Sequence, residues 1–311
     1  MIKMNGVIKR YGNLVALNQF DLNVEDGQIY GLLGPNGSGK STAINSMLAL
    51  LSIEKGEIKL FGQRITPTSY AIKRNIGLVP QEVAVLEDLN VQENVDYFCG
   101  LYVSDYRERK RLVDAAIAFT DLDKFRKFLP KKLSGGLKRR LNIACGIAHK
   151  PSLLILDEPT VAVDPQSRNA ILEGIKALNQ QGTTVLYTSH YMEEVEQICT
   201  TITIMDKGKG LLTGTKEELK ASVNLGDQVD IRLINHKAED MDTIRSLPYV
   251  VKAELVEDHL KLEMARGESR LASLFHVLER QGIGMAEMSV RQPTLNDVFL
   301  EVTGKELRDH V

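Results

Sequence analysis

Short apolar runs alternate with helical patterns along the first two thirds of the chain. An apolar run at residues 29–33 precedes a glycine-rich loop and a helical pattern at 41–51. Further apolar or β-branched runs, several ending in a polar residue before a helix, predict buried parallel strands at residues 76–80, 153–157, 184–189 and 201–206. This alternation predicts an α/β fold with its functional groups at the carboxyl ends of the strands.

The pattern changes twice further along the chain. Between about residues 82 and 149 helical periodicity dominates, which predicts a helical insertion. From about residue 225 the order β-α-β-β-α-β precedes a final helix, with predicted bounds of 230–234, 240–247, 250–256, 260–264, 269–281, 285–291 and 294–303. This order predicts a small α+β, ferredoxin-like domain at 225–303 and a tail at 304–311. The domain has no glycine-rich phosphate loop and no acidic or His/Cys cluster, so a packing or regulatory module is favoured over a second catalytic site.

Composition and charge exclude several classes of protein. The 311 residues suffice for one large or two ordinary domains, and 41 acidic against 39 basic residues give a net charge of −2, without a global nucleic-acid signature. Three cysteines, far apart and without CxxC spacing, indicate a reducing compartment and no disulfide or zinc site. The N-terminus lacks the pattern of a signal peptide, and no stretch approaches the roughly 18 apolar residues that cross a bilayer.

The segment GPNGSGKST, residues 34–42, fits the phosphate-loop pattern G-x-x-x-x-G-K-[ST] between a predicted strand and a predicted helix. Glycines let such a loop turn its backbone N–H groups toward phosphate oxygens. Lys40 would bring positive charge to the β- and γ-phosphates, and Ser41 would offer its hydroxyl to Mg²⁺. The predicted nucleotide-binding residues here are Gly34, Pro35, Asn36, Gly37, Ser38, Gly39, Lys40, Ser41 and Thr42.

Two further predicted strands end in residues suited to phosphate chemistry. LLILDEP, residues 153–159, places Asp157 where a metal-anchoring carboxylate is expected, followed by Glu158. A desolvated carboxylate needs a cation or hydrogen bonds, so two in succession require a reason. We assign Asp157 to Mg²⁺ and Glu158 to polarising the attacking water. His190 follows the strand VLYTS and is predicted to reach the γ-phosphate.

LSGGLKRRLNIA, residues 133–144, places a serine and two glycines directly before an apolar helical pattern. Glycine destabilises a helix interior by about 1 kcal/mol relative to alanine, so the pair needs an explanation. Either the segment is an ordinary turn, or its backbone amides face an anion.

Together these segments resemble, in content and order, the motifs of the ATP-binding subunit of an ABC transporter over about residues 1–220. The motifs are the phosphate loop, Gln81 in GLVPQE, LSGG, LLILDEP, VDP at 163–165 and TSH at 188–190. The resemblance implies an ATP-binding domain at 1–222 with a P-loop NTPase core, an antiparallel β subdomain and a helical subdomain at about 82–149. It also implies that Gln81 serves catalysis and the metal, that Asp164 contacts nucleotide, and that Tyr11 in RYGN stacks on adenine.

Subunits of this family pair head to tail, and the LSGG turn of one covers the γ-phosphate held by the phosphate loop of the other. The resemblance therefore implies that Ser134, Gly135 and Gly136 complete the site of a partner, either a second copy or a paralogous subunit. ATP would join the pair and its hydrolysis would release it, consistent with two-fold symmetry.

The sequence departs from the family pattern at a few positions. Arg139 stands where many relatives carry glutamine, Leu137 where methionine or glutamine is frequent, and Ala162 and Val163 where glycine and leucine are common. We expect these residues to tune packing across the dimer.

A basic stretch overlaps the LSGG segment. It favours a solvated helix face near phosphates or an anionic membrane over a nucleic-acid patch, and comprises Lys124, Arg126, Lys127, Lys131, Lys132, Lys138, Arg139 and Arg140.

Two segments point to one branch of the family. VLEDLNVQENVDYFCGLY, residues 85–102, and RQPTLNDVFLEVTGKEL, residues 291–307, resemble parts of ATPases that serve ABC-2-type exporters of drugs, antibiotics and ions. Separate membrane subunits would then carry the translocation path and substrate choice, with this chain peripheral on the cytoplasmic face of the membrane. An importer ATPase stays an alternative, as does a non-transport ATPase acting on ribosomes or DNA. The latter usually has two nucleotide domains or a long coiled coil.

Overall fold

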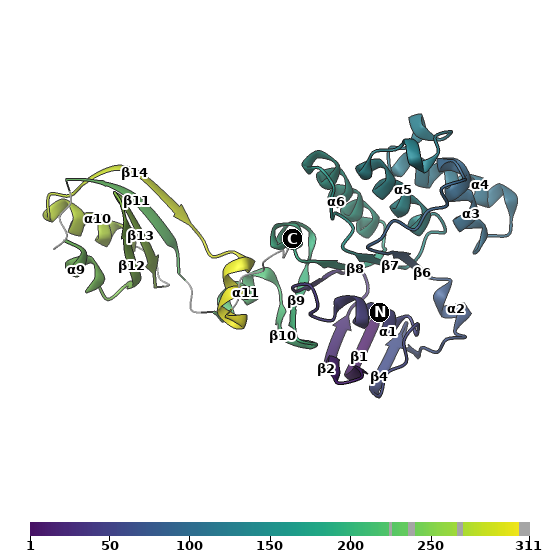
Figure 1. The fold of residues 1–311 in the computed structure, drawn as a ribbon, viewed down its shortest axis with the longest axis horizontal. Helices are drawn as coiled ribbons and strands as arrows, with labels where there is room; N and C mark the ends of the chain where they lie inside the picture. Colours follow the sequence, from purple (N-terminus) through teal and green to yellow (C-terminus); the bar gives the residue numbers. More distant parts are fainter. Residues whose placement is uncertain (224–225, 236–239, 266–269, 305–311) are drawn as a thin grey trace. The chain divides into compact units, whose positions relative to one another are not determined.

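The computed structural model describes residues 1–223, 226–235, 240–265 and 270–304, shown in Figure 1. The chain divides into two compact units, Met1–Thr215 and Lys216–Glu306. The division falls before helix α8 (Lys216–Ser222), which contacts the last helix of the second unit, whereas the sequence pattern placed it at about 222–225. Most of the predicted tail, residues 305–311, lies outside the described residues.

The first unit is built on a six-stranded sheet with the order β10-β9-β3-β8-β7-β6. The parallel strands are β3 (Ile29–Leu33), β6 (Ile76–Val79), β7 (Leu153–Asp157), β8 (Thr184–Ser189) and β9 (Thr201–Asp206), and β10 (Lys209–Gly214) pairs antiparallel with β9. All five predicted strands are present. Every residue of β3, β7 and β8 is buried, which explains their continuous apolar or β-branched character.

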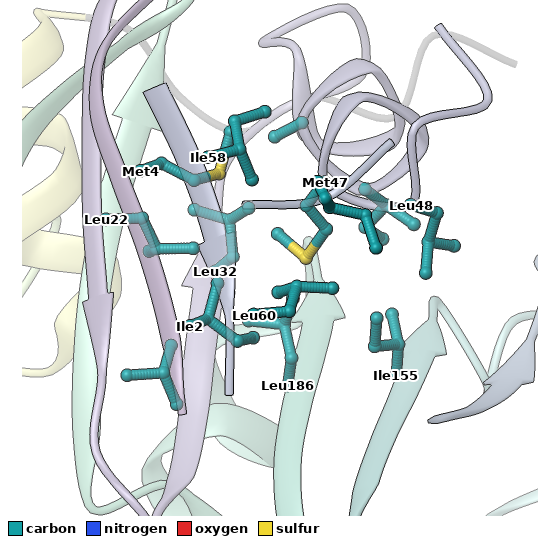
Figure 2. Packing of buried hydrophobic residues seen from close by; sticks show 14 of the residues in the cluster. Ile2, Met4, Leu22, Leu32, Met47, Leu48, Ile58, Leu60, Ile155 and Leu186 are labelled. Carbon is teal, nitrogen blue, oxygen red and sulfur yellow. The ribbon is translucent and has the colours of Figure 1, made fainter. Parts of the chain in front are cut away.

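A second, antiparallel sheet has the order β2-β1-β4-β5 and confirms the β subdomain that the family resemblance implied. Its strands are β1 (Ile2–Tyr11), β2 (Leu14–Val24), β4 (Lys55–Leu60) and β5 (Gln63–Arg64). Figure 2 shows Ile2, Met4 and Leu60 packing toward Met47 and toward Leu32, Ile155 and Leu186 of the central sheet. This shared core fixes the phosphate loop, which lies at the end of β3, relative to both sheets.

Helices cover the central sheet on both sides, with α1 and the antiparallel sheet opposite α5 and α6 (Figure 1). The insertion contains α3 (Val91–Gly100), α4 (Tyr106–Phe119) and α5 (Gly135–Ile147), within the predicted range 82–149. The other helices of the first unit are α1 (Lys40–Met47), α2 (Tyr70–Lys73), α6 (Pro165–Gln180) and α7 (Met192–Ile198). The prediction that α1 continues to residue 51 is wrong, because Ala49 adopts a left-handed conformation (φ 52°) that ends the helix.

The second unit has a four-stranded antiparallel sheet with the order β12-β13-β11-β14. Its elements after α8 are β11 (Gln228–Ile234), α9 (Asp240–Arg245), β12 (Val250–Val256), β13 (His259–Met264), α10 (Arg270–Arg280), β14 (Gly284–Arg291) and α11 (Leu295–Thr303). Strand β13 lies between β11 and β12, which α9 connects, so the sheet has the split βαβ arrangement predicted for a ferredoxin-like domain. Alternate residues such as Ile231 and Leu262 meet Leu274 and Leu278 of α10 in its core.

Candidate functional site

The phosphate loop, residues 34–39, leads from the end of β3 into the first turn of α1. Gly39 has φ 111°, and a Cβ there would lie 2.6 Å from the carbonyl oxygen of Ala16. A Cβ on Gly34 would collide with the carbonyl oxygen of Met205. Gly39 is also the N-cap of α1, and glycine has no side chain that could accept hydrogen bonds there. The backbone N–H groups in the first turn of α1 are therefore available to an anion.

Lys40 lies inside this loop and not on the surface, with only 5% of its residue surface exposed. Its ammonium donates to the carbonyl oxygens of Gly34 (2.7 Å) and Pro35 (3.2 Å). It also lies 3.1 Å from the Oε1 atom of Glu158. The positively charged ammonium of Lys40 therefore faces the carboxylate of Glu158, the residue that follows β7.

Glu158 stands at the centre of the site, just past β7, in a strained left-handed conformation (φ 47°). Its Oε2 atom accepts a hydrogen bond from Nε2 of Gln81 (3.0 Å) and lies 3.2 Å from Nδ1 of His190. Burial by itself would raise the pKa of the Glu158 carboxyl, but the bond to His190 and the charge of Lys40 outweigh it, so the pKa lies below its ordinary value. Glu158 is thus ionised at neutral pH.

The sheet topology explains why these residues meet. Lys40, His190, Glu158 and Gln81 follow β3, β8, β7 and β6, which are consecutive neighbours in the sheet. Their carboxyl ends lie at one edge, as expected for an α/β fold. Asp157, the last residue of β7, accepts a hydrogen bond from the hydroxyl of Thr188 on β8 (2.6 Å).

Ser134, Gly135, Gly136 and Asp164 form a different cluster. Ser134 caps α5 by accepting from the N–H of Leu137 (3.3 Å), and both Ser134 and Gly135 are exposed. Asp164 caps α6 by accepting from the N–H of Ser167 (2.9 Å), and hydrogen bonds from Ser167 lower its pKa. A Cβ on Gly136 would lie 2.8 Å from the Ser167 hydroxyl, so glycine here lets the start of α5 pack on the start of α6. Gly136, the second glycine of the pair, is thus required by the packing of α5 on α6 within the same chain.

Tyr11 ends β1, in the antiparallel sheet. Its residue surface is 46% exposed, and the ammonium of Lys9 lies 5.4 Å from the centre of its ring. An exposed aromatic ring of this kind can stack on a base. Its assignment to adenine stays a prediction.

Sequence reasoning missed two residues that hold the site together. The hydroxyl of Thr188 donates to Asp157 and accepts from the backbone N–H of Glu158 (3.0 Å). Glu194 of α7 is buried, and its carboxylate accepts from Thr160 (2.6 Å) and Tyr187 (2.7 Å).

The other oxygen of Glu194 pairs with Arg168 of α6 (3.1 Å), so the carboxylate connects the segments that carry Glu158, His190 and Asp164. A signal was present in the sequence. Glu194 shares the apolar face of α7 with Ile198, four residues later, and an acidic residue on such a face needs buried partners.

The prediction that Arg139 belongs to a solvated basic face is wrong. Only 5% of its residue surface is exposed, because its guanidinium turns inward and donates to the carbonyl oxygens of Pro80 (3.0 Å) and Gln81 (2.7 Å). Arg139 therefore fixes the Pro80–Gln81 backbone within its own chain. The expectation that Arg139 tunes packing across a dimer does not fit this placement. Arg140 and Lys138 pair with Asp121 and Glu87.

The fold and the cluster around Glu158 define a P-loop ATP-binding and ATP-hydrolysing protein. Comparison with known families agrees: residues 17–161 match the ABC transporter family, and residues 214–303 match the C-terminal domain of DrrA1-3-like ATP-binding proteins. Among solved structures, the dimeric ATP-binding cassette MJ0796 in a post-hydrolysis state, bound to ADP and Pi, is similar with a TM-score of 0.64 and 27% identity. That match covers 69% of this chain and 98% of the cassette.

Relatives align with nearly the whole chain. The linearmycin resistance ATP-binding protein LnrL of Bacillus subtilis is 37% identical and covers 99% of this chain and 100% of its own length. The daunorubicin resistance ATP-binding protein DrrA3 of Streptomyces coeruleorubidus is 32% identical, and the match covers 99% of this chain and 97% of DrrA3. The Nod factor export ATP-binding protein I of Cupriavidus pinatubonensis is 32% identical, and the match covers 99% of this chain and 92% of that protein. The chain belongs to the family of ABC transporter ATP-binding proteins, which confirms the resemblance seen in its motifs.

Proposed function

We propose that the chain powers export of a substrate through separate ABC-2-type membrane subunits, while bound at the cytoplasmic face of the membrane. The observation that carries the chemistry is the contact of Lys40 with Glu158, with Gln81 and His190 on the second carboxylate oxygen. Export is supported by the relatives, which are named for antibiotic resistance or export and align with both units of this chain. None of the described helices is long and apolar enough to cross a membrane.

The residues of the cluster suggest a division of roles in hydrolysis. Glu158 would polarise the attacking water, since its carboxylate is ionised and held in one orientation by three neighbours. Lys40 would bind the β- and γ-phosphates, and His190 would contact the γ-phosphate. The N–H groups at the start of α1 would bind phosphate oxygens. Positioning of this kind supplies most of the catalysis in phosphoryl transfer.

The donor atoms at this edge suit Mg²⁺. Ser41 is exposed in the first turn of α1, which follows β3, and the Asp157 carboxylate ends β7, which β8 separates from β3 in the sheet. With the amide oxygen of Gln81 they form a set of hard oxygen ligands, which Mg²⁺ prefers. We infer that Ser41, Asp157 and Gln81 hold the ion, which would neutralise charge on the phosphates.

The LSGG turn would serve a second subunit. Ser134 and Gly135 are exposed at the start of a 13-residue helix, and a Cβ on Gly135 would meet nothing nearer than the carbonyl oxygen of Ala162 at 3.8 Å. An exposed helix start of this kind suits the γ-phosphate bound by another copy. Two copies related by a two-fold axis would enclose two ATP molecules, with Asp164 beside each LSGG turn.

A groove of about 320 Å³ between the central sheet and the helical insertion suits a cytoplasmic segment of the membrane subunit. Its lining is mainly apolar and includes Leu50, Leu101 and Tyr102, which are exposed. Pro80 and Ala84, on either side of Gln81, also line it. A segment bound there would touch the loop that reaches Glu158, which would connect transport to hydrolysis.

Co-purification in detergent tests the export assignment. The tagged chain should recover an ABC-2-type membrane protein, and Leu101→Glu should abolish the recovery while leaving ATP hydrolysis within about twofold. Val251→Glu is the matched control, since Val251 is equally exposed (58% against 57%) but lies in the second unit. Recovery of ribosomes or DNA in place of a membrane protein would contradict the assignment.

A further inference from the structure

Helix α5 makes contacts at two levels, and only its first turn carries the LSGG glycines. About one and two turns further along, Arg139 and Asn142 reach the loop after β6. Asn142 donates to the carbonyl oxygen of Pro80 (3.3 Å) and accepts from the N–H of Ala84 (3.2 Å). Together with the two bonds from Arg139, four hydrogen bonds join α5 to residues 80–84, across 58 to 62 positions of sequence.

The loop that α5 holds is the one that reaches the catalytic carboxylate. The backbone carbonyl oxygen of Gln81 accepts a hydrogen bond from Arg139 (2.7 Å), while the side-chain amide of Gln81 donates to Glu158 (3.0 Å). The path from Ser134 to Glu158 therefore runs through one helical turn, one guanidinium and one glutamine. Each step is a direct contact or a single turn of rigid helix.

Stability alone does not explain Arg139. Its guanidinium is buried, and within the described part of the chain no carboxylate lies within 4.0 Å of it. Burial lowers its pKa. A buried charge that faces only carbonyl oxygens is costly compared with an apolar side chain of similar volume. The fork of the guanidinium does provide two parallel donors, which fix the direction of the Pro80–Gln81 backbone as a single amide could not.

We propose that Arg139 is a positioning residue that ties the LSGG turn of each subunit to Gln81 of the same subunit. This inference rests on the proposed dimer. There, the LSGG turn of a subunit belongs to one ATP site while its Gln81 belongs to the other. When the partner's ATP engages Ser134 and Gly135, α5 moves with it, and Arg139 moves the Pro80–Gln81 backbone, which shifts the Gln81 amide relative to the Glu158 carboxylate that it already contacts. The two ATP sites of the dimer are thereby coupled through each copy's α5.

A fluorescence reporter can follow this coupling, because the chain contains no tryptophan. Val83→Trp places a single indole at an exposed position in the 80–84 loop, and Glu158→Gln keeps ATP bound in the full-length protein. ATP should change the emission as the dimer forms. Adding Arg139→Gln should leave the ATP-induced dimer intact by light scattering but remove most of the emission change.

Turnover gives the second readout. Arg139→Gln without the reporter should lower kcat for ATP hydrolysis about tenfold, while KM for ATP stays within about twofold of the parent value. A change of about tenfold is typical for the loss of coupling between two sites. Arg140→Gln is the matched control: it removes the same charge from the next position, where Arg140 pairs with Asp121 and not with the loop. The control should keep both the emission change and kcat.

The outcomes separate this inference from the proposed function. If Arg139→Gln matches Arg140→Gln in emission and kcat, the coupling role is wrong while the dimer stands. If the Glu158→Gln parent does not dimerise with ATP, the proposed dimer fails and the inference with it. Should Arg139→Gln not fold, Arg139→Lys can replace it, because lysine keeps the charge but lacks the planar fork of two donors. Arg139→Lys should show smaller losses of the same two quantities, the ATP-induced emission change and kcat.

Discussion

The two units of this chain treat buried polar groups differently. In the first unit, charged side chains are buried close to the site, namely Lys40, Arg139, Asp157, Glu158 and Glu194. In the described part of the second unit every buried side chain is apolar. Backbone strain does not follow this division: Glu158 and Ala162 have positive φ next to the site, but so do Ala49 and Lys207 elsewhere in the first unit and Glu257 in the second.

This difference shows where the fold carries chemistry. Buried charges reduce stability, so they persist where another requirement fixes them. The first unit satisfies its buried charges with specific partners at a sheet edge. The second unit has a regular apolar core, which is what packing alone requires. The predictions below test this division from the largest expected effect to the smallest.

Replacing the central carboxylate should have the largest effect. Glu158→Gln should lower kcat roughly 10²- to 10⁴-fold, because the variant keeps the shape of the side chain and loses the base. Steady-state phosphate release measures the loss. Glu254→Gln, an exposed residue of the second unit, should leave kcat unchanged. A variant at Glu158 that keeps near-normal turnover would remove this residue from the mechanism.

A core substitution in the second unit should act on stability and not on chemistry. Leu274→Ala leaves a cavity in a fully buried position and should reduce the free energy of unfolding of that unit by about 2–5 kcal/mol. Calorimetry of the full chain should show one transition moved to lower temperature. ATP affinity should stay the same, and a parallel loss of ATP binding would mean that the units are not independent.

Removal of the loop cation should weaken nucleotide binding itself. Lys40→Met keeps the length of the side chain but loses charge-assisted bonds to phosphate, which corresponds to about 10- to 150-fold in Kd. Titration calorimetry with ATP gives the value directly. Unchanged affinity would count against the phosphate-loop assignment.

The smallest effect concerns the start of α11. The carboxyl of Asp297 is partly buried, which raises its pKa, but bonds from the N–H and hydroxyl of Thr294 and from Arg291 outweigh this and hold the pKa below its usual 3.8. Asp297→Asn should therefore cost about 1 kcal/mol at neutral pH.

Because the folded pKa lies below the unfolded one, the carboxylate stabilises the fold above its ordinary pKa. That contribution is lost as pH falls through the folded value. Urea unfolding of Asp297→Asn and of the parent should thus converge in acid. A difference that stays constant down to low pH would exclude this origin.

Much of the fold could be predicted because buried parallel strands and split βαβ order leave clear apolar runs. The five parallel strands of the six-stranded central sheet and the β-α-β-β-α-β order were both visible. The long strands β1 and β2 were not identified from the pattern, because their partly exposed residues and bulges interrupt the alternation. The end of α1 depended on one left-handed alanine, which no periodicity reveals.

The site was predictable where a residue type is tied to a motif. Lys40 of the phosphate loop comes together with Glu158 and His190, as the strand ends suggested, and with Gln81, which the family resemblance implied. Thr188 and Glu194 were not predicted and Arg139 was assigned to a solvated face, since these residues act through partners 30 to 59 positions away or through burial. Single-sequence reasoning treats such a residue as ordinary until the fold supplies its neighbours.

The central claim is that one ATP molecule is enclosed by two copies of the chain, and mixing two inactive variants tests it directly. Lys40→Met disables the phosphate loop, and Gly135→Glu blocks the LSGG turn at a position where a Cβ makes only an ordinary contact with the Ala162 carbonyl oxygen (3.8 Å). Each variant alone should be inactive. In a mixed dimer, the intact loop of one chain faces the intact LSGG turn of the other. If the two copies pair at random, an equal mixture should therefore recover activity up to about a quarter of the normal ATPase rate, and less to the extent that α5 couples the intact site to the blocked one. A mixture no more active than its separate components would contradict the shared site.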